Sequence, residues 1–113
     1  MIPDGIPLKL LKGVTVGSLW IYVLAIIASK PSYPYDVRKM IREVFGFEPP
    51  IVTLYTTFYR LEREGLIKKD KGLYSITDRG KIALAKAISF LRSLAREIEE
   101  ISSIEVRDNR DPV

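Results

Sequence analysis

The sequence predicts a mostly helical α+β fold in a single domain, with four helical segments and one two-stranded hairpin. Hydrophobic residues recur at the three-to-four spacing of helices in four separate stretches of the chain. One short stretch around Lys71 and Gly72 instead has two apolar pairs flanking a tight turn, which is typical of a hairpin. The length of 113 residues suits one domain with one modest core.

Composition argues against several classes of function. The chain has no cysteine, so neither a disulfide framework nor thiolate chemistry is available. It also has no histidine, which is the commonest metal ligand and the commonest general base. The acidic residues show no spacing that would bring a pair of carboxylates together. We therefore expect no enzyme, no metal site and no cofactor.

The chain opens with an arm over residues 1–13, followed by a predicted helix over 14–29. No charged residue occurs from Gly13 to Ser29. This stretch is shorter than the roughly 20 apolar residues that span a bilayer, and no small-residue cleavage site follows it. We expect a buried helix, in the core or a dimer interface of a cytoplasmic protein without membrane contact. Pro31 ends this helix.

Two further helices are predicted over 34–45 and 51–64. Pro34 suits the first turn of the former, and Gly46 lies at its end. The expected buried stripe of this helix consists of Val37, Met40, Ile41 and Val44. In the latter helix, 4-then-3 spacing defines a core face made of Leu54, Phe58 and Leu61. Gly65 is suited to end it.

The predicted hairpin over 66–76 is followed by a long helix over 78–104, for which Thr77 is the expected N-cap. Apolar residues in this helix recur at alternating spacings of three and four, which is typical of helix pairing. These residues are Leu84, Ala87, Leu91, Leu94, Ile98 and Ile101. The long helix is therefore expected to pair with another helix.

The predicted order is helix, helix, helix, hairpin, long helix, which is the layout of a winged helix-turn-helix protein. We divide the chain into an arm with the winged part over 1–76, a dimerisation helix over 77–105 and a polar tail over 106–113; the first two form a single domain. Residues 1–71 hold eleven Lys and Arg against seven Asp and Glu, whereas the remainder holds seven of each. A basic front part fits contact with a polyanion such as DNA.

Several short motifs within residues 18–95 resemble those of the PadR-like transcriptional regulators. They are Tyr35-Asp36-Val37, Thr53-Leu54-Tyr55, Arg60-Leu61-Glu62, Glu64-Gly65-Leu66 and Tyr74-Ser75-Ile76-Thr77, with Gly80 shortly after. The chain departs from the family pattern at Pro34 and Val52, where glycine is frequent, and at Thr56, where proline is frequent; its hairpin is also shorter. The resemblance implies a homodimeric DNA-binding repressor whose first and last helices form the dimer. It also implies a small aromatic effector near that interface, since some relatives bind one.

The outward face of the helix over 51–64 and the hairpin supply most of the predicted contacts with double-stranded DNA. Hydroxyl groups bond phosphates or base edges, arginine grips guanine or phosphate through two bonds, and lysine neutralises phosphate. The candidates are Tyr35 and Arg38 in the second helix, Thr53, Tyr55, Thr56, Tyr59, Arg60 and Arg63 in the third helix, and Lys68, Lys69 and Lys71 in the hairpin.

Several of these candidates have structural alternatives. Thr53 could cap its helix, and Arg63 could pair with acids of the same helix. Tyr35 could pack between helices, and the hairpin lysines could protect an exposed strand edge against pairing.

The predicted dimer interface combines the first and last helices. Its residues are Leu19, Trp20, Val23, Leu84, Leu91, Leu94, Ile98 and Ile101. Trp20 is either a large core residue or a surface on which the implied aromatic effector stacks. The alternative function is a winged-helix module that binds another protein and does not bind DNA.

Overall fold

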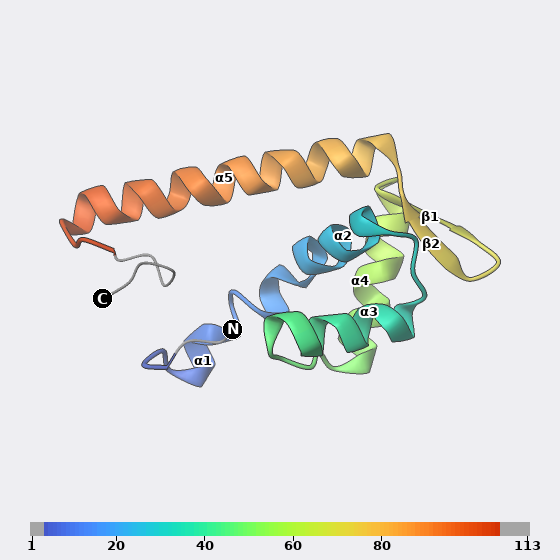
Figure 1. The fold of residues 1–113 in the computed structure, drawn as a ribbon, viewed down its shortest axis with the longest axis horizontal. Helices are drawn as coiled ribbons and strands as arrows, with labels where there is room; N and C mark the ends of the chain where they lie inside the picture. The colour runs from blue at the N-terminus through green and yellow to red at the C-terminus, as the bar shows by residue number, and fades with distance from the viewer. Residues whose placement is uncertain (1–3, 107–113) are drawn as a thin grey trace.

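The computed structural model describes residues 4–106 and has the architecture of a winged helix-turn-helix protein (Figure 1). In chain order the elements are α1 (Leu8–Leu11), the 3₁₀ helix η1 (Val16–Ser18), α2 (Leu19–Ser29), α3 (Pro34–Met40), the π-helix η2 (Ile41–Phe45), α4 (Ile51–Arg63), β1 (Ile67–Asp70), β2 (Leu73–Ile76) and α5 (Asp78–Ser102). The predicted class, mostly helical with a two-stranded wing and a long last helix, is confirmed. The predicted polar tail lies, apart from Val106, outside the described residues.

The central helix of the protein is α2, which packs against α3, α4, α5 and β2. Its buried side chains are Leu19, Val23, Leu24, Ile26 and Ile27. The core face predicted for α4 joins the same cluster, and its buried residues are Leu54, Phe58 and Leu61. Full burial of one such side chain stabilises the fold by about 1.5–3 kcal/mol. The core therefore fixes which face of α4 remains at the surface.

The segment before α2 is less regular than the sequence predicted. The α-helix begins at Leu19 and not at residue 14, so the prediction is wrong over its first five residues. Two glycines weaken helix formation here, and the amide of Gly17 bonds the carbonyl of Lys12, five residues back, at 2.9 Å. Leu8–Ser29 is apolar and long enough by composition to cross a membrane. It is nevertheless divided into three short helices, and the last of them, α2, lies in the core of the protein.

A π-helical turn changes the inward face at the end of the second predicted helix. Val37 and Ile41 are buried as expected, but Val44 is half exposed, so its assignment to the buried stripe is wrong. The wider turn of η2 carries one more residue than an α-turn, which rotates Val44 outward and Phe45 inward. The Phe45 ring then meets the edge of Tyr22 with 4.7 Å between ring centroids.

The wing is a tight antiparallel hairpin supported by a third backbone pairing. In the register of the two strands, Ile67 lies opposite Ile76 and Asp70 lies opposite Leu73. The two turn residues, Lys71 and Gly72, both have positive φ, as the two-residue hairpin turn that matches strand twist requires. Ser32, before α3, exchanges two backbone hydrogen bonds with Tyr74 of β2, at 2.9 and 3.0 Å. This bridge ties the hairpin to the start of the helix-turn-helix unit.

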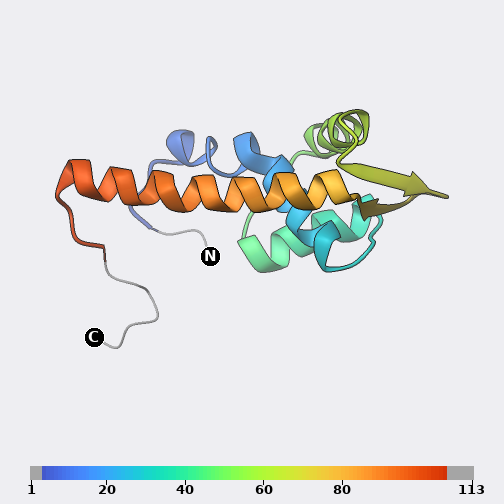
Figure 2. The same cartoon turned by 90° about the horizontal axis from the view of Figure 1, so that it is seen from above.

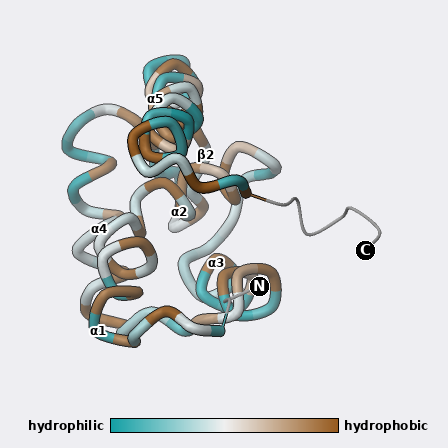
Figure 3. Tube along the Cα trace, turned by 90° about the vertical axis from the view of Figure 1, so that its left-hand side faces the viewer, coloured by the Kyte–Doolittle hydropathy of each residue, from teal (hydrophilic) through white to brown (hydrophobic). Residues whose placement is uncertain are grey.

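The last helix, α5, projects well beyond the winged body (Figures 1 and 2). Thr77 caps it as predicted, because its hydroxyl accepts a hydrogen bond from the Gly80 amide at 3.0 Å. Only Gly80 and Ala87 are buried among its 25 residues. Exposed apolar residues continue along the projecting part from Leu91 to Ile101. Figure 3, which looks down α5, shows hydrophobic and hydrophilic residues mixed on its turns. The described chain is accordingly elongated, with extents of 49 × 27 × 26 Å.

Candidate nucleic-acid interface

The outward face of α4 carries a continuous stripe of exposed side chains. Since Leu54, Phe58 and Leu61 point into the core, the opposite side of the helix faces solvent. The stripe follows 4-3-4 spacing and consists of Val52, Thr56, Tyr59 and Arg63, all exposed. Tyr55 and Arg60, also exposed, flank it on either side. Five of the six residues predicted from this helix therefore lie on one accessible surface.

The threonine hydroxyls of α4 bond the helix itself. Thr56 Oγ1 donates to the carbonyl of Val52 at 2.9 Å, and Thr57 Oγ1 donates to the carbonyl of Thr53 at 2.8 Å. The hydroxyl proton is thereby used, whereas the oxygen lone pairs and the methyl group remain available. Thr56 can thus accept a bond from a base amino group or contact a thymine methyl.

Thr53 is half-buried within α4. The helix begins at Ile51 after Pro50, and no side chain caps this end. The alternative role of Thr53 as an N-cap is therefore wrong. Its side chain instead lines a hollow of about 580 Å³ between α4 and the start of α2. The other wall of this hollow includes Gly17 and Trp20, and Arg60 lies at the α4 side.

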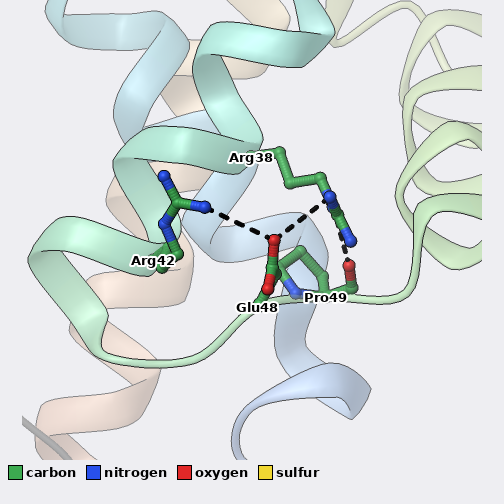
Figure 4. Close-up of polar contacts among 4 residues, drawn as sticks. All are labelled: Arg38, Arg42, Glu48 and Pro49. Atoms are coloured by element: carbon green, nitrogen blue, oxygen red, sulfur yellow. Dashed lines mark hydrogen bonds and ion pairs between the residues drawn. The ribbon is translucent and has the colours of Figure 1, made fainter.

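The turn between η2 and α4 is held by a charged cluster (Figure 4). The Glu48 carboxylate lies 3.1 Å from Arg38 Nη1 and 3.6 Å from Arg42 Nη1. Arg38 Nε also donates to the carbonyl of Pro49 at 3.1 Å. Arg38 therefore fixes the approach to α4, and its charge is shared with Glu48. Arg42 and Glu48 were missed by the sequence analysis, because their meeting depends on the path of the turn.

Two tyrosines lie at the start of α3. Tyr35 is 76% exposed, so the alternative that it packs between helices is wrong. The ring of Tyr33 lies beside the wing turn, where a Cβ added at Gly72 would be 3.7 Å from it. The start of α3, which carries Tyr35, therefore lies next to the wing turn.

The wing lysines are exposed on β1 and at the turn. Lys68, Lys69 and Lys71 are all at the surface. Lys69 Nζ lies 5.8 Å from the centroid of the Tyr74 ring, close enough for a weak cation–π contact. Within residues 4–106, none of these lysines forms an ion pair, and neither does Arg63. Pairing of Arg63 with acids of its own helix is thus not seen, and its charge is available to a polyanion.

Val52 is a further surface residue that the predicted set lacked. It is 74% exposed although it is apolar, and it opens the outward stripe of α4. Its 4-residue spacing to Thr56 was visible in the sequence and could have placed it on this face. In the described part of the chain, no cluster of acidic side chains could hold a metal ion.

The residues predicted for the dimer interface fall into two groups. Leu19 and Val23 are buried in the core of the protomer itself, so they offer no surface to a partner. Trp20 is 38% exposed beside the hollow. The exposed members on α5 are Leu91, Leu94, Ile98 and Ile101, and Leu84 is partly buried against the core.

A model of the transcriptional regulator PadR-like family matches residues 23–86, which is more than half of the chain. The chain belongs to this family. The match begins within α2 and ends within α5, so it contains the helix-turn-helix unit and the wing. Membership confirms the predicted resemblance and makes the protein a DNA-binding transcription regulator and not an enzyme.

The PadR-like fold is also seen in solved structures. A PadR family transcriptional regulator from Eggerthella lenta DSM 2243 matches with a TM-score of 0.74 and 24% identity, over 86% of this chain and 92% of its own. A transcriptional regulator from Streptococcus is 27% identical, with a TM-score of 0.68, over 85% of this chain and 99% of its own. A PadR family transcription regulator from Clostridium difficile R20291 is 25% identical, with a TM-score of 0.65, over 74% of this chain and 96% of its own. The comparison with curated proteins gave no match.

Proposed function

We propose that this PadR-like protein is a homodimeric repressor that binds a specific double-stranded DNA site, with α4 in the major groove. The observation that carries the proposal is the exposed stripe of α4, which combines hydroxyl, apolar and arginine side chains beside a lysine-bearing wing. Such side chains distinguish base pairs at their major-groove edges. Repression follows where the bound site overlaps a promoter, in the cytoplasm where the chromosome lies.

The proposed contacts divide into base contacts and phosphate contacts. Side chains assigned to base edges are Thr53, Tyr55, Thr56, Tyr59, Arg60 and Arg63, with Val52 added from its position on the stripe. Side chains assigned to phosphates are Tyr35, Arg38, Lys68, Lys69 and Lys71. Phosphate contacts position the protein on the duplex, and base contacts select the sequence.

The proposed homodimer rests on the projecting part of α5. Beyond its contact with α2, this amphipathic helix leaves Leu91, Leu94 and Ile98 exposed within residues 4–106. Pairing with the same helix of a second protomer would bury this seam. Two α4 helices related by a two-fold axis would then contact half-sites about 34–36 Å apart, one turn of the duplex.

Selection from a random duplex pool, followed by titration of the selected duplex at two salt concentrations, tests the DNA contact. We expect specific binding that weakens steeply with salt, because cationic side chains release counterions from DNA. Arg60→Ala should lower the specific affinity, whereas Arg92→Ala, on exposed α5, serves as a matched control with unchanged affinity. Absence of binding at low salt would overturn the proposal.

The alternative, a winged-helix module that binds protein, requires an α4 surface that does not engage DNA. The exposed side chains of η2 and α4 include three arginines, Arg42, Arg60 and Arg63. Together with the exposed wing lysines they favour a polyanion as the binding partner. Transcription from a template carrying the selected site distinguishes repression from activation: addition of the protein should lower the transcript yield.

A small aromatic effector is a second candidate, favoured by the hollow between α2 and α4. Trp20 offers a flat ring on one wall, and Arg60 and the half-buried Thr53 lie on the other. A ligand there would sit against the DNA-contacting helix. Trp20 is the only tryptophan in the chain, so its intrinsic fluorescence reports occupancy directly. Titration with aromatic compounds should quench it, and unchanged fluorescence throughout would exclude this site.

A further inference from the structure

A second hollow, of about 340 Å³, lies between the end of α2, α3 with η2, and the wing. The connection from α2 to α3 borders it and runs beside the wing (Figure 1). No residue lines both this hollow and the one beside Trp20, so the two are separate. Ligand pockets in proteins have volumes of roughly 300–1,000 Å³. The second hollow is therefore large enough for one small molecule and too small for a bulky one.

The buried part of its lining is apolar. Ile26 of α2 is 7% exposed, and Met40 and Leu73 are partly buried. Ile26 belongs to the hydrophobic core and Met40 packs against that core, so both side chains are held in place. Apolar side chains of this kind remove the hydrocarbon part of a ligand from water.

The exposed part of the lining carries charges of both signs. Its charged side chains are Lys30, Asp36, Lys39 and Glu43, all at the surface. Two cations are thus balanced by two carboxylates, and the lining has no net charge. Within residues 4–106, none of the four forms an ion pair, so their charges are available to a ligand. Separated charges without a net charge favour a molecule that itself carries one positive and one negative group.

Ser32 adds a buried polar group to the lining. It is only 5% exposed, and its Oγ donates to the carbonyl of Lys30 at 3.0 Å. The hydroxyl proton is thereby used, whereas the oxygen lone pairs remain available to a donor such as an ammonium group. The backbone of Ser32 also pairs with Tyr74 of β2, so this residue joins the hollow to the wing.

We propose that this hollow binds a small zwitterion with an apolar body, which is the chemistry of an amino acid with a hydrophobic side chain. The apolar body packs on the buried part of the lining. The carboxylate of the ligand pairs with Lys30 and Lys39, and its ammonium group bonds Asp36 and Ser32. Binding of this ligand does not depend on the DNA contact of the proposed function.

A ligand in this position contacts α3 and the wing together. The proposed function assigns phosphate contacts to both elements, through Tyr35 and Arg38 on α3 and through Lys68 and Lys69 on β1, the strand paired with β2. A ligand that holds the two elements together reduces the freedom that they lose when DNA binds. It should therefore raise the affinity for DNA, and DNA should raise the affinity for the ligand by the same factor. This consequence rests on the proposed function.

Titration of the full chain with leucine and three analogues tests the chemistry of the site. Isocaproate lacks the ammonium group of leucine, isoamylamine lacks its carboxylate, and glycine lacks its apolar body. In NMR spectra, leucine should shift the amide signals of Ser32, Met40 and Leu73. Each analogue should bind about tenfold more weakly or worse, because each lacks one charged or apolar contact.

Substitution of single charges tests whether leucine occupies the hollow. Lys39→Gln and Asp36→Asn should each weaken leucine binding about tenfold, because each removes one charged partner of the ligand. Lys86→Gln and Glu97→Gln remove the same charges from exposed positions on α5 and are the matched controls. Both control proteins should bind leucine as the wild type does.

The outcomes separate the ligand site from the DNA contact. Absence of shifts at the three amides with leucine, methionine or phenylalanine at millimolar concentration would overturn the site. Isoamylamine or isocaproate binding as tightly as leucine would overturn the zwitterion as its ligand. Leucine that binds in the hollow without changing the affinity for the selected duplex would refute the coupling to DNA. A protein that binds leucine there but no DNA would refute the proposed function and leave the ligand site intact.

Discussion

Gly80, in the first turn of α5, lies directly against the backbone carbonyl of Leu66 at the start of the wing. A Cβ placed on Gly80 would overlap the Leu66 oxygen and would approach Ile76 Cγ1 to 2.7 Å. The same Leu66 carbonyl accepts a hydrogen bond from the Thr77 amide at 3.1 Å. Glycine therefore lets α5 begin in contact with the hairpin, which sets the direction of the helix relative to the winged body.

Replacing Gly80 by alanine should separate α5 from the wing. The added methyl group meets backbone that cannot move aside, so we expect a loss of about 1–3 kcal/mol in the free energy of unfolding. Urea denaturation followed by circular dichroism measures it. Gly17→Ala is the control, because the nearest atom to its added Cβ would be 3.5 Å away and its stability should be nearly unchanged. Equal stability of both variants with the wild type would contradict the close approach.

Thr77 makes two hydrogen bonds at this junction, and its removal should weaken the junction in a different way. Its hydroxyl donates to the carbonyl of Gly65 at 2.6 Å and accepts from the Gly80 amide at 3.0 Å. Thr77→Ala should cost about 0.5–2 kcal/mol, as for other lost N-caps. Thr77→Ser keeps the hydroxyl and should retain most of the stability, measured in the same denaturation experiment. A serine variant as unstable as the alanine variant would assign the effect to the methyl group.

Features that depend on spacing along one helix could be predicted from the sequence. Leu54, Phe58 and Leu61 face the core because apolar spacing alone fixes the buried side of a helix. Thr77 could be assigned as a cap because its residue type and position suffice. The hairpin followed from Gly72 in the turn, which takes positive φ without strain.

Features that depend on local backbone detail or on distant segments could not be predicted. Val44 was misplaced because a π-turn shifts the inward face by one residue, and apolar spacing does not reveal such a turn. Leu19 and Val23 were assigned to an interface, although several helices of the same protomer bury them. The cluster around Glu48 likewise depends on how the turn folds back on α3.

Glu48 partly neutralises two arginines next to α4, so its charge should limit DNA affinity. Glu48→Gln removes the shared carboxylate and frees Arg38 and Arg42 for phosphate. We expect tighter binding at low salt. The slope of log K against the logarithm of the salt concentration should become steeper by about 0.9 for each added phosphate contact. Fluorescence anisotropy at a series of salt concentrations measures this slope. Glu43→Gln is the control, because Glu43 forms no ion pair within residues 4–106.

The effect on folding should be small, because the pairs around Glu48 are partly exposed. Exposed ion pairs contribute only about 0.2–1 kcal/mol. A Glu48→Gln protein whose free energy of unfolding fell well beyond this range would show that the cluster acts mainly in folding and not in DNA binding.

Tyr22 fixes the arm to α2, and loss of its hydroxyl should release the arm without unfolding the core. Tyr22→Phe retains the ring contacts with Phe45 and Phe47, whose centroids lie 4.7 and 5.2 Å away. The lost hydrogen bond to the carbonyl of Val14 should cost about 0.5–1.5 kcal/mol. Trypsin should then cleave the arm faster after Lys9 and Lys12, as followed by mass spectrometry.

Tyr33→Phe serves as the control for this cleavage experiment. The Tyr33 side chain is half exposed beside the wing, and its hydroxyl forms no hydrogen bond to any residue of the described chain. Trypsin should therefore cut the arm of the Tyr33→Phe protein at the wild-type rate. Equal cleavage rates in all three proteins would contradict an anchoring role for Tyr22.

Val52 and Lys68 should show the difference between a base contact and a phosphate contact. Val52 opens the stripe of α4 with its methyl groups exposed, which suits a thymine methyl in the major groove. Val52→Asn should therefore lower discrimination at one position of the site, by at most the roughly 1–3 kcal/mol that one mismatched base pair costs, and leave the salt dependence unchanged. Lys68→Ala should weaken binding to every sequence alike. It should also reduce the slope of log K against the logarithm of the salt concentration by about 0.9. Affinities for a set of single-base variants of the selected duplex, each at two salt concentrations, separate the two effects. A Val52→Asn protein with a changed salt slope and unchanged base preference would place that end of α4 on the phosphate backbone and not in the groove.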